Sequence, residues 1–282
     1  MTTILYTVLA LLAFAGNSVL CRLALGEGAI DAASFSVIRL VSGAAVLLFI
    51  LKVIPKKATG VSKGSWRAAL MLFLYAVTFS FAYVSLDTGT GALILFGLVQ
   101  LTMIGASLTQ GYRLRWFEWS GVALAFLGLV YLLLPSISTP PLGGFILMAL
   151  SGVAWAGYTL VGRGSGDPMS DTAYNFMRCL PLVLVLLAVS YQSRLLSIEG
   201  VLLAILSGGL TSGIGYAIWY AALKGLTAIQ ASAVQLLVPL LAAFGGVVLI
   251  NEPLSKPLIL ASVMILGGVL LVMLAKQYVP QR

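Results

Sequence analysis

Long apolar runs, separated by short clusters of charged residues, set the pattern of this 282-residue chain. The first run, residues 3–21, holds no charged residue before Arg22, and runs of similar length follow to the end of the sequence. A helix that crosses a membrane needs about 20 mostly apolar residues. The charged residues and prolines divide the chain into ten segments of suitable length.

The first two predicted spans are residues 3–21 and 32–51, the third lies between Arg67 and Asp87, and the fourth lies between Asp87 and Arg113. The fifth and sixth lie within the uncharged run 119–162, which Pro135, Pro140 and Pro141 interrupt, and the seventh is residues 172–192. The eighth lies between Glu199 and Lys224, the ninth lies between Lys224 and Glu252, and the tenth ends at Lys276. These runs do not show the alternation of apolar and polar residues that is typical of membrane β-barrels. The pattern therefore predicts an all-α integral membrane protein with ten transmembrane helices.

Composition excludes other classes of protein. Hydrophobic residues make up 61% of the chain and charged residues 9%, whereas soluble domains carry about 25% charged residues. Too little polar sequence remains to cover a water-soluble core, and a disordered chain or a disulfide scaffold is excluded as well. The N-terminal run lacks the basic start of a signal peptide, so we expect it to be the first helix.

The net charge of +8 is explained by membrane topology. With ten spans, both termini lie on one side, and the loops on that side hold most of the basic residues, including the cluster at 52–67 and Arg113, Arg115 and Arg163. Loops on the other side hold only Arg194 and Lys256. Because cytoplasmic loops are enriched in Lys and Arg, we expect both termini to be cytoplasmic. A nucleic-acid partner is not indicated.

Two stretches of the sequence repeat. Residues 13–22 align without gaps to residues 154–163, and Arg39 aligns with Arg178 after a slip of two residues. Each half, residues 1–137 and 138–282, contains five spans, and an odd number forces the second copy to run through the membrane upside down. Inverted repeats are typical of secondary transporters with a substrate site near the midplane, although a channel can also use them.

Several kinds of chemistry are missing from the sequence. There is no histidine, Cys21 and Cys179 lie in apolar runs, and no Asp or Glu lies deep in a predicted span. We therefore expect no catalytic residues, no metal and no cofactor, since a membrane-embedded enzyme would lack proton-transferring groups. Proton-coupled exporters use embedded acids or histidine. A neutral or zwitterionic substrate that moves by uniport, or by coupling through a less obvious group, is favoured.

The motifs resemble those of a known superfamily. Phe14-Ala15-Gly16-Asn17-Ser18 in the first helix, and Pro239 followed by Asn251-Glu252-Pro253-Leu254, resemble the drug/metabolite transporter superfamily in its EamA-type branch. The first half departs from the Pro…Glu-x-Leu pattern, with Gln100 in place of Pro and Arg113 in place of Glu.

Within that branch the chain resembles YddG-type exporters of aromatic and other neutral amino acids. The resemblance implies alternating-access export of such amino acids, or of similar small metabolites, across the bacterial inner membrane. A broad-specificity drug or metabolite exporter is the alternative within the class, and a channel or a membrane-embedded enzyme the alternative outside it. The implied partners are a small-molecule substrate and the lipid bilayer.

Polar side chains near the membrane centre are costly unless they face a cavity or a partner. The amides of Asn17, Gln100 and Gln235 suit a zwitterion, although contact between helices explains them equally well. Aromatic residues at the same depth are able to form an apolar box, while Tyr83 and Trp219 lie nearer the span ends and also fit interfacial anchors. The candidate substrate-binding residues are Phe14, Asn17, Thr78, Phe79, Tyr83, Gln100, Trp155, Tyr158, Ser212, Tyr216 and Gln235.

Two arginines, Arg39 and Arg178, lie within spans about two turns from the span starts. Each is interpreted either as a gate or carboxylate contact, or as a structural tie to backbone carbonyls, and their place in the repeat favours the tie. Pro181 and Pro239 each remove a backbone hydrogen bond and are candidate hinges.

Overall fold

Helices make up the regular structure of the described part of the chain. The computed structural model describes residues 2–53, 63–109, 115–132, 140–162, 165–190, 195–226, 231 and 234–277. Within these ranges, β-pairing is limited to one isolated bridge between Ile30 and Leu196. Arg113, Arg163, Arg194 and Pro135, on which parts of the sequence predictions rest, lie outside the described residues.

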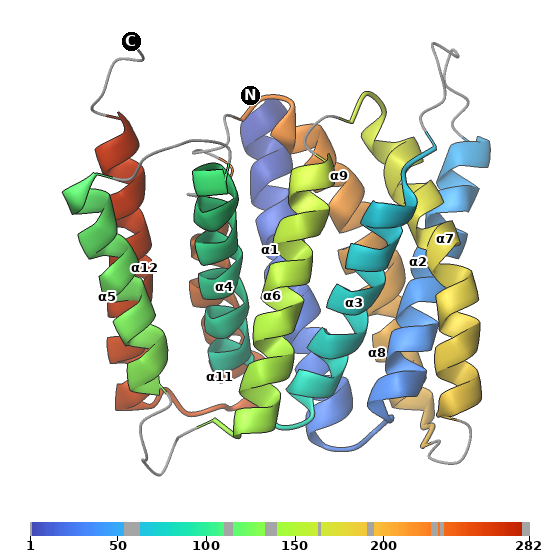
Figure 1. Ribbon diagram of the computed structural model, residues 1–282. Coiled ribbons are helices and arrows are strands. Elements are labelled where there is room, and N and C mark those ends of the chain that lie inside the picture. Colours follow the sequence, from blue (N-terminus) through green and yellow to red (C-terminus); the bar gives the residue numbers. More distant parts are fainter. Residues whose placement is uncertain are drawn as a thin grey trace.

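The helices stand side by side as a bundle of long rods (Figure 1). In chain order they are α1 (Thr2–Gly26), α2 (Ala32–Val53), α3 (Trp66–Tyr83), α4 (Thr88–Thr109), α5 (Trp116–Leu132), α6 (Leu142–Gly162), α7 (Pro168–Val189), α8 (Ile198–Leu206), the π-helix η2 (Ser207–Ile214), α9 (Gly215–Leu223), α11 (Leu237–Ile250) and α12 (Lys256–Gln277). α1 begins, and α12 ends, at the same end of the bundle, which we call the terminal end.

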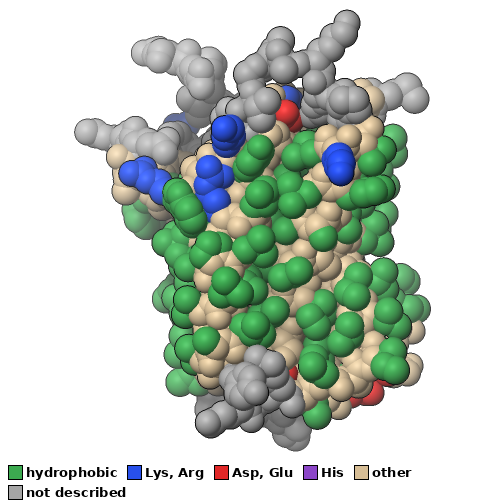
Figure 2. Space-filling model, turned by 90° about the vertical axis from the view of Figure 1, so that its right-hand side faces the viewer, with side chains coloured by type: hydrophobic (Ala, Val, Ile, Leu, Met, Phe, Trp, Pro, Cys, Tyr) green, Lys and Arg blue, Asp and Glu red, His purple; other side chains and the backbone are tan. Residues whose placement is uncertain are grey.

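Length and hydropathy make this a multi-pass membrane protein. Seven helices in the described ranges are long and apolar enough to cross a membrane: α1, α2, α3, α4, α6, α7 and the continuous segment Ile198–Leu223. α5, α11 and the part of α12 up to Val272 are shorter apolar helices. Green apolar side chains cover the flank of the bundle in Figure 2, and the Lys and Arg side chains on this face lie toward the terminal end.

The surface and the interior differ in the way expected for a lipid-facing bundle. Val189 and Ile198 are 80% and 83% exposed, and Trp66, Trp116 and Trp119 also point outward. Polar residues such as Asn17 are instead buried. This distribution fits a protein whose solvent is lipid, because apolar side chains cost nothing on such a surface whereas unpartnered polar groups do.

Close helix contacts position the centre of the bundle. α2 packs against α7 and η2, α3 against α6, and α1 against α9, η2 and α11. At Gly208 of η2, a Cβ atom would lie 2.1 Å from the Arg39 carbonyl oxygen of α2. Only glycine fits this contact, which brings the α2 and η2 backbones together as small residues do in membrane bundles.

We predict that Gly208→Ala lowers the yield and the thermal unfolding midpoint of detergent-purified protein, because the added methyl group forces α2 and η2 apart. The matched control is Gly105→Ala on α4, where a Cβ atom would meet no described atom within 4 Å outside the backbone of its own helix. Size-exclusion profiles and thermal unfolding of the two variants check the prediction. Equal behaviour of both variants would contradict the proposed close contact.

Candidate functional site

Asn17 joins α1 to the π-helix and to α3. Its Oδ1 atom accepts hydrogen bonds from the hydroxyls of Ser207 at 2.6 Å and Thr211 at 3.1 Å, and its Nδ2 atom donates to the Tyr75 hydroxyl at 3.3 Å. Asn17 is buried, so these bonds satisfy an amide that lies away from water. Rare π-turns are frequently found at functional sites, and here the π-turn presents its hydroxyls to α1.

Arg39 lies next to this junction and is 1% exposed. Its Nε atom donates to Ser212 at 2.9 Å, and its Nη2 atom donates to the hydroxyls of Tyr216 at 2.7 Å and Tyr75 at 3.2 Å. The guanidinium carbon lies 5.2 Å from the ring centroid of Tyr75 and 4.9 Å from that of Phe79. Hydrogen bonds to hydroxyls and contacts with aromatic ring faces therefore stabilise the guanidinium charge.

Seven aromatic side chains beside this arginine contact one another and form a cluster that we call the aromatic cage. Trp155 lies at its centre, with ring centroids 4.8 Å from Tyr216, 4.9 Å from Tyr75 and 5.3 Å from Phe14. The Trp155 Nε1 atom donates to Gln235 at 3.2 Å. The members are Phe14, Tyr75, Phe79, Trp155, Tyr158, Tyr216 and Trp219.

All seven cage residues are at most 5% exposed, so the cage is closed in this structure. Its walls are apolar, whereas a small set of hydroxyl, amide and guanidinium groups converges on it. Sites for small molecules combine an apolar lining with a few placed polar groups in this way.

Most of the candidate residues predicted from the sequence meet here. The structure brings together Phe14, Asn17, Phe79, Trp155, Tyr158, Ser212, Tyr216 and Gln235, with Arg39.

Thr78 and Tyr83 make other contacts, and Gln100 is fully buried on α4. Thr78 is half-buried and donates to the Leu74 carbonyl of its own helix. Tyr83 ends α3, where it contacts the Phe79 ring and donates to the Thr88 carbonyl.

Sequence reasoning missed Tyr75, Ser207 and Thr211. Tyr75 contacts Asn17, Arg39 and Tyr216 at once, and its place in the middle of the third span was a usable signal. Trp219 is not an interfacial anchor, since it is fully buried and its ring lies 5.5 Å from Phe14. Tyr83 is likewise fully buried.

The second arginine of the repeat has a different environment. Arg178 donates to the backbone carbonyls of Lys63 and Tyr174 and lies near the rings of Trp66 and Tyr174. It is therefore tied to backbone carbonyls near the terminal end, whereas the bonds of Arg39 go to side-chain hydroxyls. Pro181 lies inside α7, and Pro239 is buried in the first turn of α11.

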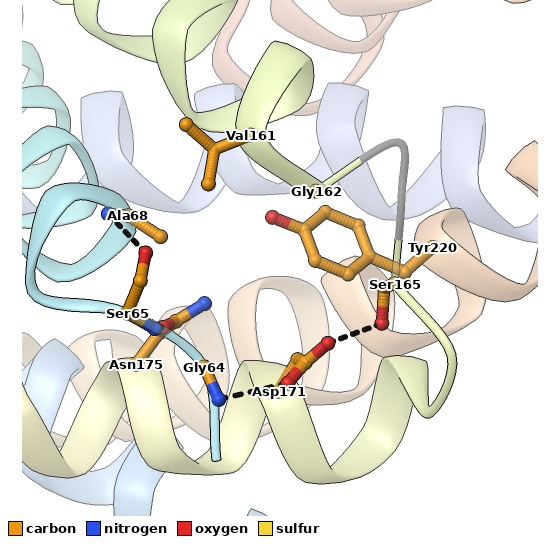
Figure 3. Close-up of a pocket in the computed structure, with 9 residues that line it drawn as sticks. All are labelled: Gly64, Ser65, Ala68, Val161, Gly162, Ser165, Asp171, Asn175 and Tyr220. Atoms are coloured by element: carbon orange, nitrogen blue, oxygen red, sulfur yellow. Dashed lines mark hydrogen bonds between the residues drawn. The ribbon is translucent and has the colours of Figure 1, made fainter. Parts of the chain in front are cut away.

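A pocket of about 220 Å³ lies at the terminal end, between the starts of α3 and α7 and the ends of α6 and α9 (Figure 3). The Asp171 carboxylate accepts hydrogen bonds from the Gly64 backbone N–H at 2.8 Å and from the Ser165 hydroxyl. Asn175 accepts one from the Ser65 N–H at 3.0 Å. Tyr220 also lines the pocket and stacks on Tyr158 of the cage at 5.3 Å, so one ring pair connects the two regions.

The opposite end of the bundle is fastened by Glu252, the acidic residue of the motif in the second half. Its carboxylate accepts from the Thr88 backbone N–H at 2.9 Å, and Arg22 Nε donates to it at 3.2 Å. Arg22 also lies 3.5 Å from Asp87. Because Thr88 begins α4, the negative charge stands at the positive end of the helix dipole. Glu252 thus joins α1, α4 and the end of α11.

We predict that Glu252→Gln lowers the thermal unfolding midpoint by several degrees, because the charged hydrogen bonds to Arg22 and Thr88 weaken by about 1.5–3 kcal/mol. Glu27→Gln, an exposed acid just beyond α1, is the matched control and should leave the midpoint unchanged. Thermal unfolding of the purified proteins checks this. A midpoint for Glu252→Gln equal to that of the control would rule out the fastening role.

Comparisons with known proteins agree with this architecture. Residues 142–274 match the model of the EamA-like transporter family. Uncharacterized protein PA1977 of Pseudomonas aeruginosa is 53% identical over 271 residues, which are 96% of this chain and 94% of that protein. A protein of known crystal structure, 19% identical, has a TM-score of 0.66 over 98% of this chain and 99% of its own, which shows a shared fold. Residues 142–274 therefore carry a domain of the EamA-like transporter family, in the drug/metabolite transporter superfamily, which indicates a small-molecule membrane transporter.

Proposed function

We propose that the protein is a secondary transporter that exports aromatic and other neutral amino acids, or similar small metabolites, across the bacterial inner membrane by alternating access. The observation that carries the proposal is the closed aromatic cage with Arg39 and Asn17 at its polar edge. It lies about midway along α1, α3 and the segment 198–223. An aromatic side chain fits the ring-lined wall, and the polar edge offers partners for the ionic end of an amino acid.

We further propose ten spans in two inverted halves, residues 1–137 and 138–282, in which α5, α11 and α12 also cross the membrane. The packing supports this arrangement, because the main helix pairs map onto one another when each span is exchanged with its counterpart five spans away. The exchange replaces α1 by α6, α2 by α7, α3 by the segment 198–223, α4 by α11 and α5 by α12, and the reverse. The contact of α3 with α6 then corresponds to that of α9 with α1, the contact of α4 with α6 to that of α11 with α1, and the contact of α2 with η2 to that of α7 with α3. The pairs α2–α7, α4–α11 and α5–α12 map onto themselves.

The terminal end is proposed to face the cytoplasm. The positive-inside rule supports this orientation, and so do the basic side chains near that end in Figure 2. In this orientation the pocket lined by Asp171 and Tyr220 is the cytoplasmic mouth, and the Arg22–Glu252 contact closes the outer side. The substrate passes between mouth and cage when the Tyr220–Tyr158 ring pair separates.

Uniport is the proposed mode of transport. Among the described residues, acidic side chains lie near the helix ends: Asp87 just before α4, Glu118 and Asp171 in the first turns of α5 and α7, and Glu252 just after α11. This distribution supports transport down the substrate gradient, since carriers driven by protons use titratable groups within the membrane.

We predict that the purified protein in liposomes shows counterflow of labelled L-phenylalanine that is accelerated by unlabelled phenylalanine, tryptophan, methionine or threonine on the other side. Trp155→Ala should lower this flux at least about tenfold, since it removes the central ring of the cage and its bond to Gln235. Trp116→Ala, at an exposed tryptophan, is the control. A Trp155→Ala protein with full flux contradicts the site, and flux without acceleration indicates a channel.

We predict that single cysteines report the orientation and the mouth in a background that lacks the buried thiols Cys21 and Cys179. Ser65→Cys should react with a membrane-impermeant thiol reagent in inside-out vesicles, whereas Glu27→Cys should react in right-side-out vesicles. Excess L-phenylalanine should slow labelling at position 65 only. The opposite sidedness would overturn the orientation, and labelling at position 65 that the amino acid does not affect would overturn the mouth.

A further inference from the structure

Arg39 is a cation at the centre of the bundle whose charge no described acid neutralises. Among the described residues, the ion pairs within 4.0 Å are those of Arg22 with Asp87 and with Glu252. Arg22 thus has carboxylates, and Arg178 has backbone carbonyls. Burying a charge without a counter-charge is costly, and intramembrane ionisable residues are retained chiefly where they act on a substrate or an ion.

The five N–H groups of the guanidinium are unevenly used. The Nε atom donates to Ser212, and the Nη2 atom donates to Tyr75 and Tyr216. The third nitrogen, Nη1, is buried and has no hydrogen-bond partner in the part of the chain that the structure describes. The two N–H groups of Nη1 are therefore available to a ligand. Three hydroxyls and two aromatic rings already fix the orientation of the guanidinium.

We propose that Nη1 of Arg39 is the anchor for the carboxylate of the transported substrate, an inference that rests on the proposed function and assigns its substrate class. A carboxylate matches a guanidinium in charge and in planar geometry, and charge-assisted bonds of this kind are about twice as strong as neutral ones. The attraction is further strengthened inside a bundle that excludes water.

The surroundings of Arg39 define the rest of the ligand. Phe79 and Tyr75 face the guanidinium, and Trp155, Tyr216 and Phe14 continue the aromatic wall from there. A small monocarboxylate with a flat apolar group therefore fits best. Organic cations without a carboxylate are rejected, because they would meet an unneutralised positive charge in a medium that screens it weakly.

The test compares ligands that differ by one group on the unmodified protein. The probes are L-phenylalanine, 3-phenylpropionate, which lacks the ammonium group, and phenylalaninamide and phenethylamine, which lack the carboxylate. Each competes against labelled L-phenylalanine for binding to detergent-purified protein. We expect 3-phenylpropionate to compete within about tenfold of phenylalanine, and the two compounds without a carboxylate to compete at least about tenfold more weakly. Equal competition by phenethylamine would overturn the proposal.

Variants assign the effect to Arg39. Arg39→Lys keeps the charge and should retain part of the preference for carboxylates, whereas Arg39→Gln should abolish it. Arg178→Gln, at the arginine tied to backbone carbonyls, is the matched control and should keep the preference. A folded Arg39→Gln protein that still prefers carboxylates overturns the proposal, and the ligand series on the unmodified protein decides the matter if this variant does not fold.

The two proposals fail in different ways. Binding and counterflow of phenylalanine that do not depend on its carboxylate leave amino acid transport standing and remove the role of Arg39. Arg39-dependent binding of 3-phenylpropionate, without binding or transport of any amino acid, supports the anchor and removes amino acids as the substrate.

Discussion

The burial of the Arg39 charge governs how the centre of this bundle is built. A guanidinium that cannot reach water must be held by other groups, and Ser212, Tyr75 and Tyr216 supply hydroxyls for that purpose. These hydroxyls belong to η2, α3 and α9, so satisfying one side chain fixes the relative positions of three segments and of α2 itself. The aromatic rings then fill the space that the polar contacts define.

Asn17 has a complementary part in the same network. Its amide binds the π-helix through hydroxyls and α3 through Tyr75, so the first helix is linked to the elements that hold the arginine. Hydrogen-bond networks in a low-dielectric interior reinforce one another, and their loss leaves several groups unpaired at once. The two ends of the bundle differ from this centre. One end is fastened by Glu252, and the other is hollowed beside Asp171.

The sequence predicted the helical membrane class and much of the cage, because both follow from local properties. Span length and hydropathy are read directly from the chain, and residues such as Asn17 and Trp155 stand out as polar or aromatic side chains in the middle of apolar runs. Which side chains from different helices come together could not be predicted in this way. Arg39 and Arg178 look equivalent in the sequence and have opposite environments, since that depends on which helices pack against them. Asp171 meets Gly64 only through the contact between α3 and α7.

The π-turn is the other feature that the sequence did not reveal, and it has a geometric consequence. A π-helix pairs residue i with residue i+5, so each residue of η2 turns the chain by less than the about 100° of an α-helix, and the number of residues in η2 sets the direction in which every later side chain points. Removing one residue between Ser207 and Ile214 would change the winding of this segment and shift Tyr216, Trp219 and Tyr220 together relative to Phe14, Arg39 and Tyr158. The segment thus acts as a spacer of fixed length, and its exact number of residues matters as much to the cage as the identity of its side chains.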